Sequence, residues 1–294
     1  MKNTNYGKIF NIIRTSKKIS LSELADKDIS RSSISQFETG KTILSVDKFF
    51  HSLERMNVTN EEFSEIYNYH YLRSFSLYQF SLDLSNAYYQ SDIRMLKKIL
   101  NSLKDGAFFS DLPSQTNHFL QLVVEAYIYR SSNKLPEHCI SRTSQLFNYL
   151  DRVTIWGLYE FYLASSCACL FNKKQLEKIG NKILPHLAMY NYSSTIYTTA
   201  LMMLHNMIYS CLTNEFLFLA STFLNYTNSL KLSERSLLTK FCFTYDKGYL
   251  LVLLGKKEQG LGLMNQISNI FNLVGETNIT KIMEKDILFL KNSK

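Results

Sequence analysis

The sequence predicts an all-α protein, with a five-helix N-terminal domain at residues 1–66 and a right-handed α-solenoid of about five helical hairpins at residues 67–294. Three observations support this. The 294 residues contain only three prolines and ten glycines, so helix breaks are scarce. Helix-capping signals recur through the first 66 residues. In the remainder, polar breaks between apolar segments recur roughly every 41 residues.

Composition narrows the class of protein. A hydrophobic content of 46% with 14% aromatics can fill the cores of two domains. The net charge of +8 suggests an acidic partner such as nucleic acid. The five cysteines are an odd number without the spacing of a disulfide framework, which indicates a reduced, cytoplasmic chain.

A membrane span is not expected. Residues 183–214 contain no Asp, Glu, Lys or Arg, but Pro185, His205 and Asn206 interrupt the segment. No run of about 20 apolar residues survives these interruptions. The first ten residues also lack the apolar segment of a signal peptide.

The N-terminal helices begin at recognisable caps. A first helix is expected at residues 5–18, with its isoleucines on one face. Ser20 and Glu23 form a capping box for the second helix, and Thr59 with Glu62 repeats the box for the fifth. Ser45 caps a fourth helix. The side chains expected to face the core are Ile9, Ile12 and Ile13 in the first helix, Leu21, Leu24 and Ala25 in the second, and Val46, Phe49, Phe50 and Leu53 in the fourth.

The third helix, residues 31–39, has an unusual composition. Ser30 caps it, Gly40 ends it, and Ile34 and Phe37 face the core. Two short helices joined by a tight turn match the helix-turn-helix plan. Small hydroxyls let such a helix approach a major groove closely, and Arg and Gln form bidentate contacts with base edges. The predicted DNA-binding residues are Ser30, Arg31, Ser32, Ser35 and Gln36, flanked by Arg14, Lys17, Lys18 and Lys41 for phosphates.

The alternative for this region is a small helical bundle whose polar helix is merely solvated. Ten Lys and Arg against nine Asp and Glu in residues 1–66 do not exclude it. However, residues 1–22 contain five basic residues and no acid, and this asymmetry favours a DNA-binding face.

The C-terminal part is built from repeats. Polar breaks fall near residues 90, 131, 172, 213 and 255, each between an apolar helix and a more charged one. Such hairpins resemble tetratricopeptide-like repeats, with residues 277–291 as a closing helix. A solenoid of this kind curves and exposes a concave face formed by one helix of each pair, which suits an extended peptide.

The helix at residues 195–212 carries no charge, so it is either buried completely or faces a ligand. An unpaired Asn206 amide would be costly there, and it would bond a peptide backbone unless a neighbouring backbone group satisfies it. Residues 67–294 hold 23 Lys and Arg against 16 Asp and Glu, which favours a peptide with a carboxylate for Arg152 to clamp. The predicted peptide-binding residues are Asn86, Arg152, Trp156, Tyr159, Thr199, Asn206 and Tyr209, although aromatics at helical spacing are more often core.

No catalytic or cofactor site is expected. The "GKK" at residues 255–257 lacks the remaining residues of a phosphate-binding loop. Cys167 and Cys169 have no second Cys or His pair nearby, so a zinc site is not expected. No convergent catalytic set suggests an enzyme.

The chain resembles the Rgg/GadR/MutR family of transcriptional regulators over nearly its whole length. The resemblance is most specific in "GKIFNIIRTSKKISLSELAD", "ISRSSISQFETGKTILSVDKFF" and "DKGYLLVLLGKKEQGLGLMNQISNIF". It implies a cytoplasmic homodimer that binds promoter DNA and, in many members, a short peptide pheromone used in quorum sensing. By this resemblance Arg31, Ser32, Ser35 and Gln36 read DNA, and Arg152 and Asn206 lie near the peptide. The alternative is a helical-repeat interaction scaffold or a regulator that needs no ligand.

A homodimer is also expected because one helix-turn-helix reads only a short half-site. The final segment offers a candidate interface, or else a cap packed on its own solenoid, through Ile279, Ile282, Met283, Ile287 and Leu290.

Overall fold

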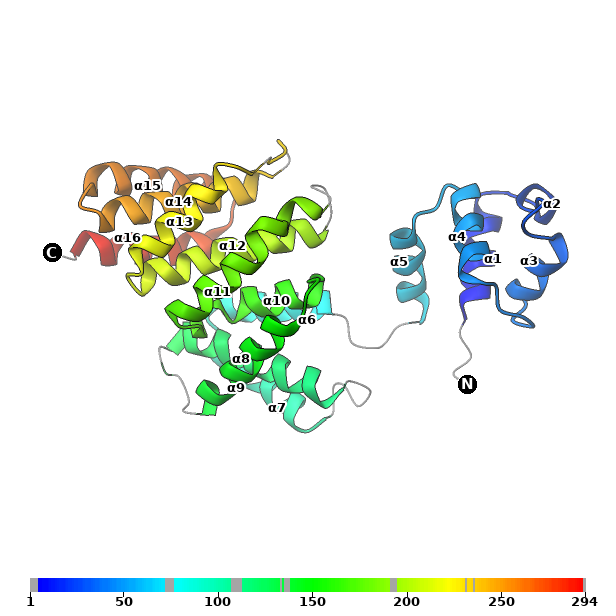
Figure 1. The fold of residues 1–294 in the computed structure, drawn as a ribbon, viewed down its shortest axis with the longest axis horizontal. Helices are drawn as coiled ribbons and strands as arrows, with labels where there is room; N and C mark the ends of the chain where they lie inside the picture. Colours follow the sequence, from blue (N-terminus) through cyan, green and yellow to red (C-terminus); the bar gives the residue numbers. More distant parts are fainter. Residues whose placement is uncertain are drawn as a thin grey trace. The chain divides into compact units, whose positions relative to one another are not determined.

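The computed structural model describes residues 5–71, 77–106, 113–132, 134, 138–190, 195–230, 232–234 and 236–292. Within these ranges every regular element is a helix, so the all-α prediction is confirmed. The chain divides into two compact units, Met1–Phe75 and Ser76–Lys294, which are described separately (Figure 1). This division falls after the expected position at residue 66, because the fifth helix runs on to Tyr71.

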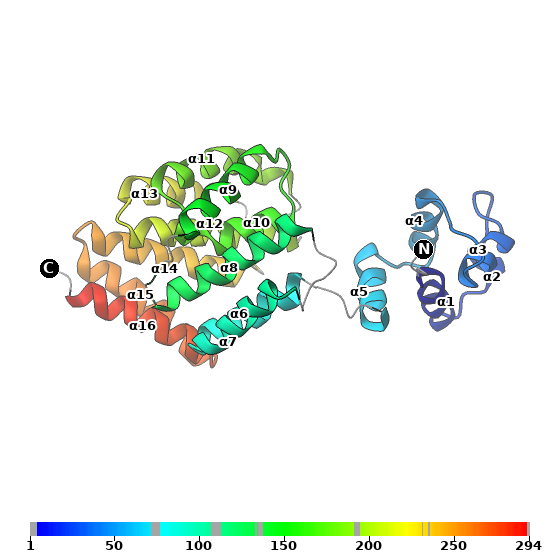
Figure 2. The ribbon, with the colours of Figure 1, turned by 90° about the horizontal axis from the view of Figure 1, so that it is seen from below.

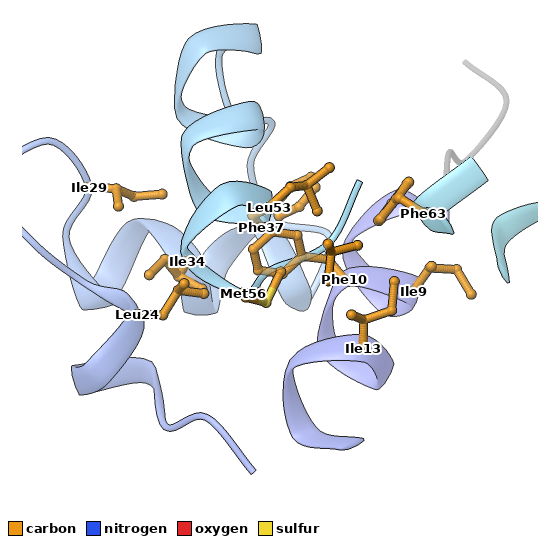
Figure 3. Close-up of a cluster of buried hydrophobic side chains, with 11 residues drawn as sticks. Ile9, Phe10, Ile13, Leu24, Ile29, Ile34, Phe37, Leu53, Met56 and Phe63 are labelled. Carbon is orange, nitrogen blue, oxygen red and sulfur yellow. The ribbon is translucent and has the colours of Figure 1, made fainter. Parts of the chain in front are cut away.

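Among its described residues, the N-terminal unit has five helices around one apolar core. Figure 3 shows side chains of this core. Phe10 and Ile34 are fully buried in it, and Phe37 meets Phe10 edge-to-face at 5.4 Å between ring centroids. The helices are α1 (Tyr6–Ser16), α2 (Leu21–Leu24), α3 (Arg31–Glu38), α4 (Val46–Arg55) and α5 (Asn60–Tyr71).

The predicted caps are present. Ser20 Oγ accepts a hydrogen bond from the Glu23 N–H at 3.1 Å, and the Glu23 carboxylate accepts from the Ser20 N–H at 2.7 Å. Thr59 and Glu62 make the same reciprocal pair. These bonds satisfy backbone N–H groups that have no partner inside the helix at its first turn. Short polar patterns in the sequence therefore predicted where these helices begin.

Close approach of α1 to the end of α3 depends on Gly7. A Cβ at this position would lie 1.9 Å from the Phe37 carbonyl oxygen, so no larger residue fits without moving α3. The predicted core of this unit needs correction at three exposed positions. Phe10 is buried where Ile12 was expected, and Ile12, Val46 and Phe50 are exposed because they lie off the buried faces of α1 and α4, which Ile9 and Leu53 occupy.

Within its described residues, the C-terminal unit has five successive helical pairs and a closing helix, and Figure 2 shows how these helices are arranged. This is the predicted number of hairpins. The pairs are α6 (Leu77–Tyr89) with α7 (Ile93–Lys104), α8 (Ser114–Ser132) with α9 (His138–Arg152), α10 (Leu158–Ser166) with α11 (Lys173–Ile183), α12 (Thr195–Thr213) with α13 (Leu217–Thr227), and α14 (Leu237–Leu253) with α15 (Lys257–Leu273). The closing helix is α16 (Thr277–Asn292), and 3-10 turns at Ala168–Leu170 and Leu184–Met189 follow α10 and α11.

The apolar residues of α16 pack on their own array. Met283, Ile287 and Leu290 are buried, and Ile279 and Ile282 line a pocket within this unit. Of the two alternatives for this helix, the burial of Met283, Ile287 and Leu290 supports the cap. The exposed apolar side chains of α16 are instead Leu288 and Phe289.

None of the described helices combines the length and the apolar character that crossing a bilayer requires.

Candidate functional site

The third helix presents a polar face outward, as its sequence predicts. Ile34 and Phe37 are buried, whereas Arg31, Ser32 and Gln36 are exposed. Ser35 is half-buried. Ser30 serves as the helix cap, since its Oγ accepts the Ser33 N–H at 3.1 Å. The exposed group offers a guanidinium, an amide and a hydroxyl on one short surface, which is the chemistry that reads base edges.

Three of the four flanking cations are exposed. Lys17, Lys18 and Lys41 project from the ends of α1 and α3, and the Lys17 Nζ donates only to the Asn57 carbonyl, at 3.2 Å. A flexible exposed ammonium group is free to rearrange toward a phosphate.

The prediction that Arg14 contacts phosphate is corrected by the structure. Arg14 is 7% exposed, and its guanidinium donates to both carboxylate oxygens of Glu38, at 2.6 and 2.9 Å. A third bond runs to the Ile19 carbonyl at 2.5 Å. Its donors are thus used inside the unit, where they hold α1 against the end of α3.

One pocket of the C-terminal unit, called the concave pocket, lies among the first helices of the pairs. It has a volume of about 500 Å³, and its lining comes from α6, α8, α10, α12, α14, α15 and α16. It is thus lined mainly by the first helix of each pair and by the closing helix. Pockets of this size hold small organic ligands or short peptides. Thr199, Asn206 and Tyr209, all on the charge-free α12, line it as predicted.

Asn206 holds a partner from a neighbouring helix. Its Nδ2 donates to the Ser165 Oγ of α10 at 2.8 Å, so a side chain rather than a backbone group satisfies part of the amide. Both residues line the pocket. The bond fixes the amide orientation while leaving its oxygen to accept from a ligand.

Arg130, at the end of α8, is the cation of this pocket and was not anticipated. Its guanidinium carbon lies 5.0 Å from the ring centroids of both Tyr88 and Tyr127. Two cation–π contacts hold the group in place without consuming its N–H donors. No described carboxylate forms an ion pair with it. The signal in the sequence was a lone arginine near the end of a largely apolar helix, directly after Tyr127 and Tyr129.

The pocket also contains an unanticipated acid, Asp286 of α16. Its Oδ2 accepts from the Tyr209 hydroxyl at 2.8 Å and from the Tyr245 hydroxyl at 3.3 Å. Burial raises the pKa of Asp286 to about 6, more than these two hydrogen bonds lower it. Helical spacing in the sequence could have predicted this position, because Asp286 lies three residues after Met283 and four after Ile282 and therefore on the same face of the helix.

Four other predicted peptide contacts lie outside this pocket. Arg152 ends α9, the second helix of its pair, and lines a separate pocket with His118 and Tyr149. Trp156 is 1% exposed, and its indole donates to the Leu150 carbonyl at 3.2 Å, so it is a core residue. Asn86 is exposed and Tyr159 is half-buried, and neither lines the concave pocket.

Two groups of described side chains have the composition of metal ligands. Glu125, His138 and Cys139 lie together, as do Asp26, Asp28 and His51. In the first group Arg142 donates to both Glu125 oxygens, at 3.1 and 3.2 Å. In the second, His51 lies 2.6 Å and Arg55 3.5 Å from the Asp26 carboxylate. Each group thus contains one carboxylate that is already paired with an arginine of the same unit.

Comparisons with known proteins agree with the geometry. Residues 110–285, more than half of the chain, match the family model for the C-terminal domain of the HTH-type transcriptional regulator Rgg. Residues 12–50 match a helix-turn-helix family model.

Solved structures share this fold at low sequence identity. The SHP pheromone receptor Rgg2(C45S) of Streptococcus dysgalactiae is 20% identical, with a TM-score of 0.73 over 96% of this chain and 97% of that one. A bacterial peptide pheromone/receptor complex is 18% identical, with a TM-score of 0.71 over 99% of both chains. The PrgX/cCF10 complex is also 18% identical, with a TM-score of 0.71 over 98% of this chain and 92% of that one. By its family-model match, the chain belongs to the Rgg family of helix-turn-helix transcriptional regulators.

Proposed function

We propose that this regulator is a cytoplasmic homodimer that binds promoter DNA through α3 and responds to a short signalling peptide held in the concave pocket. It acts by binding rather than by catalysis. The observation that carries the peptide proposal is Arg130, a pocket cation fixed between two tyrosine rings and without an ion pair among the described residues.

The pocket chemistry suits a peptide. Asn206 and Thr199 offer an amide and a hydroxyl to a peptide backbone, and such contacts give affinity that does not depend on side-chain sequence. Arg130 takes the role first assigned to Arg152, because guanidinium N–H groups pair bidentately with a carboxylate. The names of two similar structures, a pheromone receptor and a peptide pheromone/receptor complex, support the same class of ligand.

The DNA proposal rests on the exposed face of α3. Arg31, Ser32, Ser35 and Gln36 would contact base edges, and Lys17, Lys18 and Lys41 would contact phosphates. Two copies of this helix would read two half-sites about one helical turn apart, or a multiple of it.

The test of the whole proposal is selection of duplexes from a random DNA pool by the purified full-length protein, followed by sequencing. The expected result is a two-fold symmetric motif. Recovery of no motif would instead favour the alternative of an interaction scaffold.

A further inference from the structure

The end of the pocket formed by α14 and α16 is acidic. Both tyrosine hydroxyls that bond Asp286 converge on Oδ2, so among the described residues Oδ1 is left to other partners. No described Lys or Arg forms an ion pair with this carboxylate. Asp286, Tyr209 and Tyr245 all line the pocket.

A second carboxylate, that of Asp246, lies near enough to act on Asp286 electrostatically. Asp246 of α14 is fully buried, and its Oδ2 is 2.7 Å from the Nδ1 of His205, which lines the pocket. The other oxygen, Oδ1, is buried without a hydrogen-bond partner among the described residues. The negative charge of Asp246 adds to burial in raising the pKa of Asp286. Among the described residues, no Lys or Arg of α12, α14 or α16 lines the pocket, and His205 pairs with Asp246 rather than with Asp286.

The same pocket thus contains a cation, Arg130, and an anion, Asp286, that do not pair with each other. A buried charge without a partner costs free energy, and a ligand that supplies the opposite charge recovers it. A ligand with a carboxylate at one end and a cation at the other would satisfy both groups at once.

We infer that Asp286, with the hydroxyls of Tyr209 and Tyr245, binds a cationic amino or guanidinium group of the ligand while Arg130 binds its carboxylate. This inference rests on the proposed peptide function and goes further, since it requires a positive group on the ligand and sets its direction in the pocket. The group is either the free amino terminus of a peptide or a basic side chain, because both offer charged N–H donors to a carboxylate.

The experiment measures retention of synthetic octapeptide pools by the purified full-length protein, with mass spectrometry as readout. One pool is random and unmodified, one is acetylated at the amino terminus and contains Lys and Arg, and one is acetylated and lacks both. Wild-type protein should retain the unmodified pool at least tenfold more than the acetylated pool without basic residues. The acetylated pool with Lys and Arg identifies the source, since it is retained only if a basic side chain supplies the charge.

Variants test the carboxylate directly. Asp286→Asn keeps the shape and removes the charge, so it should lower retention of the unmodified pool to that of the cation-free pool. Glu284→Gln is the matched control, because Glu284 is an exposed acid on the same helix, and it should leave the preference unchanged. Tyr245→Phe removes only a hydroxyl and should reduce the preference, which provides a second variant if Asp286→Asn does not fold.

Two results would overturn the inference and are distinguishable. Equal retention of the unmodified and cation-free pools by wild-type protein contradicts the acidic subsite but leaves peptide binding intact. Retention of no pool contradicts the proposed peptide function itself.

Discussion

Arg14 of α1 and Glu38 at the end of α3 form a buried ion pair, with Nε 2.6 Å from Oε1 and Nη2 2.9 Å from Oε2. Glu38 also accepts from the Asn11 amide at 2.7 Å. The pair links the first helix to the helix proposed to enter the DNA groove. It therefore ties the orientation of α3 to the core of the N-terminal unit.

Arg14→Ala should destabilise the N-terminal unit by about 3 kcal/mol or more, because it leaves the Glu38 carboxylate buried and unpaired. Thermal unfolding followed by circular dichroism measures the loss, with the exposed Lys8→Ala as control. The double variant Arg14→Met with Glu38→Leu should recover part of the lost stability. Unchanged stability together with a smaller salt dependence of DNA binding would restore the phosphate role.

Arg31 and the two lysines should differ in what they contribute to DNA binding. Arg31→Ala should cost about 1–3 kcal/mol at the selected site and flatten base preference, since a bidentate base contact is lost. Lys17→Ala and Lys18→Ala should weaken all sequences alike and reduce the salt slope by about 0.9 per lost contact. Anisotropy titrations on selected and scrambled duplexes at several salt concentrations measure both. If Arg31→Ala weakens binding to selected and scrambled duplexes equally, Arg31 does not read a base.

Asn206→Ala should lower retention of random octapeptides regardless of their sequence, because the amide is assigned to the peptide backbone. Folding should be preserved, as the lost bond is a single hydrogen bond to Ser165, worth about 1 kcal/mol. Ser165→Ala removes the same bond while keeping the amide and serves as control. Unfolding of Asn206→Ala, with peptide retention intact in Ser165→Ala, would make the amide structural.

Asp286 should make stability fall as pH rises. Its pKa is raised to about 6 in the folded protein, above the ordinary aspartate value, so the folded state binds more protons than the unfolded state between these pH values. Its contribution to stability is therefore full below about pH 4 and is lost as pH rises through about 6. Asp286→Asn should remove this dependence and raise the melting temperature at pH 7. If the difference in melting temperature between wild type and Asp286→Asn stays constant from pH 4 to pH 7, this prediction is wrong.

Local patterns in the sequence predicted the helices well, because caps are local. Ser20 with Glu23, and Ser30, need only residues within one turn to define where a helix begins. The 41-residue spacing also predicted the number of hairpins, since each repeat is one supersecondary unit.

The pocket was predicted only in part, because its members meet through tertiary packing. Asn206 and Tyr209 could be inferred from one charge-free helix. Arg130 depends on Tyr88, which lies on another pair, and nothing local marks their contact. Arg152 was misplaced because the sequence alone does not reveal which helix of a pair faces the concave side.

We expect the concave pocket to bind a signalling peptide through Arg130. Native mass spectrometry of the full-length protein purified from its own host tests it most directly, using wild type, Arg130→Gln and the matched control Arg152→Gln, which alters the separate pocket. A bound mass of a short peptide is expected on wild type and on Arg152→Gln, and it should be lost from Arg130→Gln. No bound peptide on wild type, or equal occupancy in all three proteins, would contradict it.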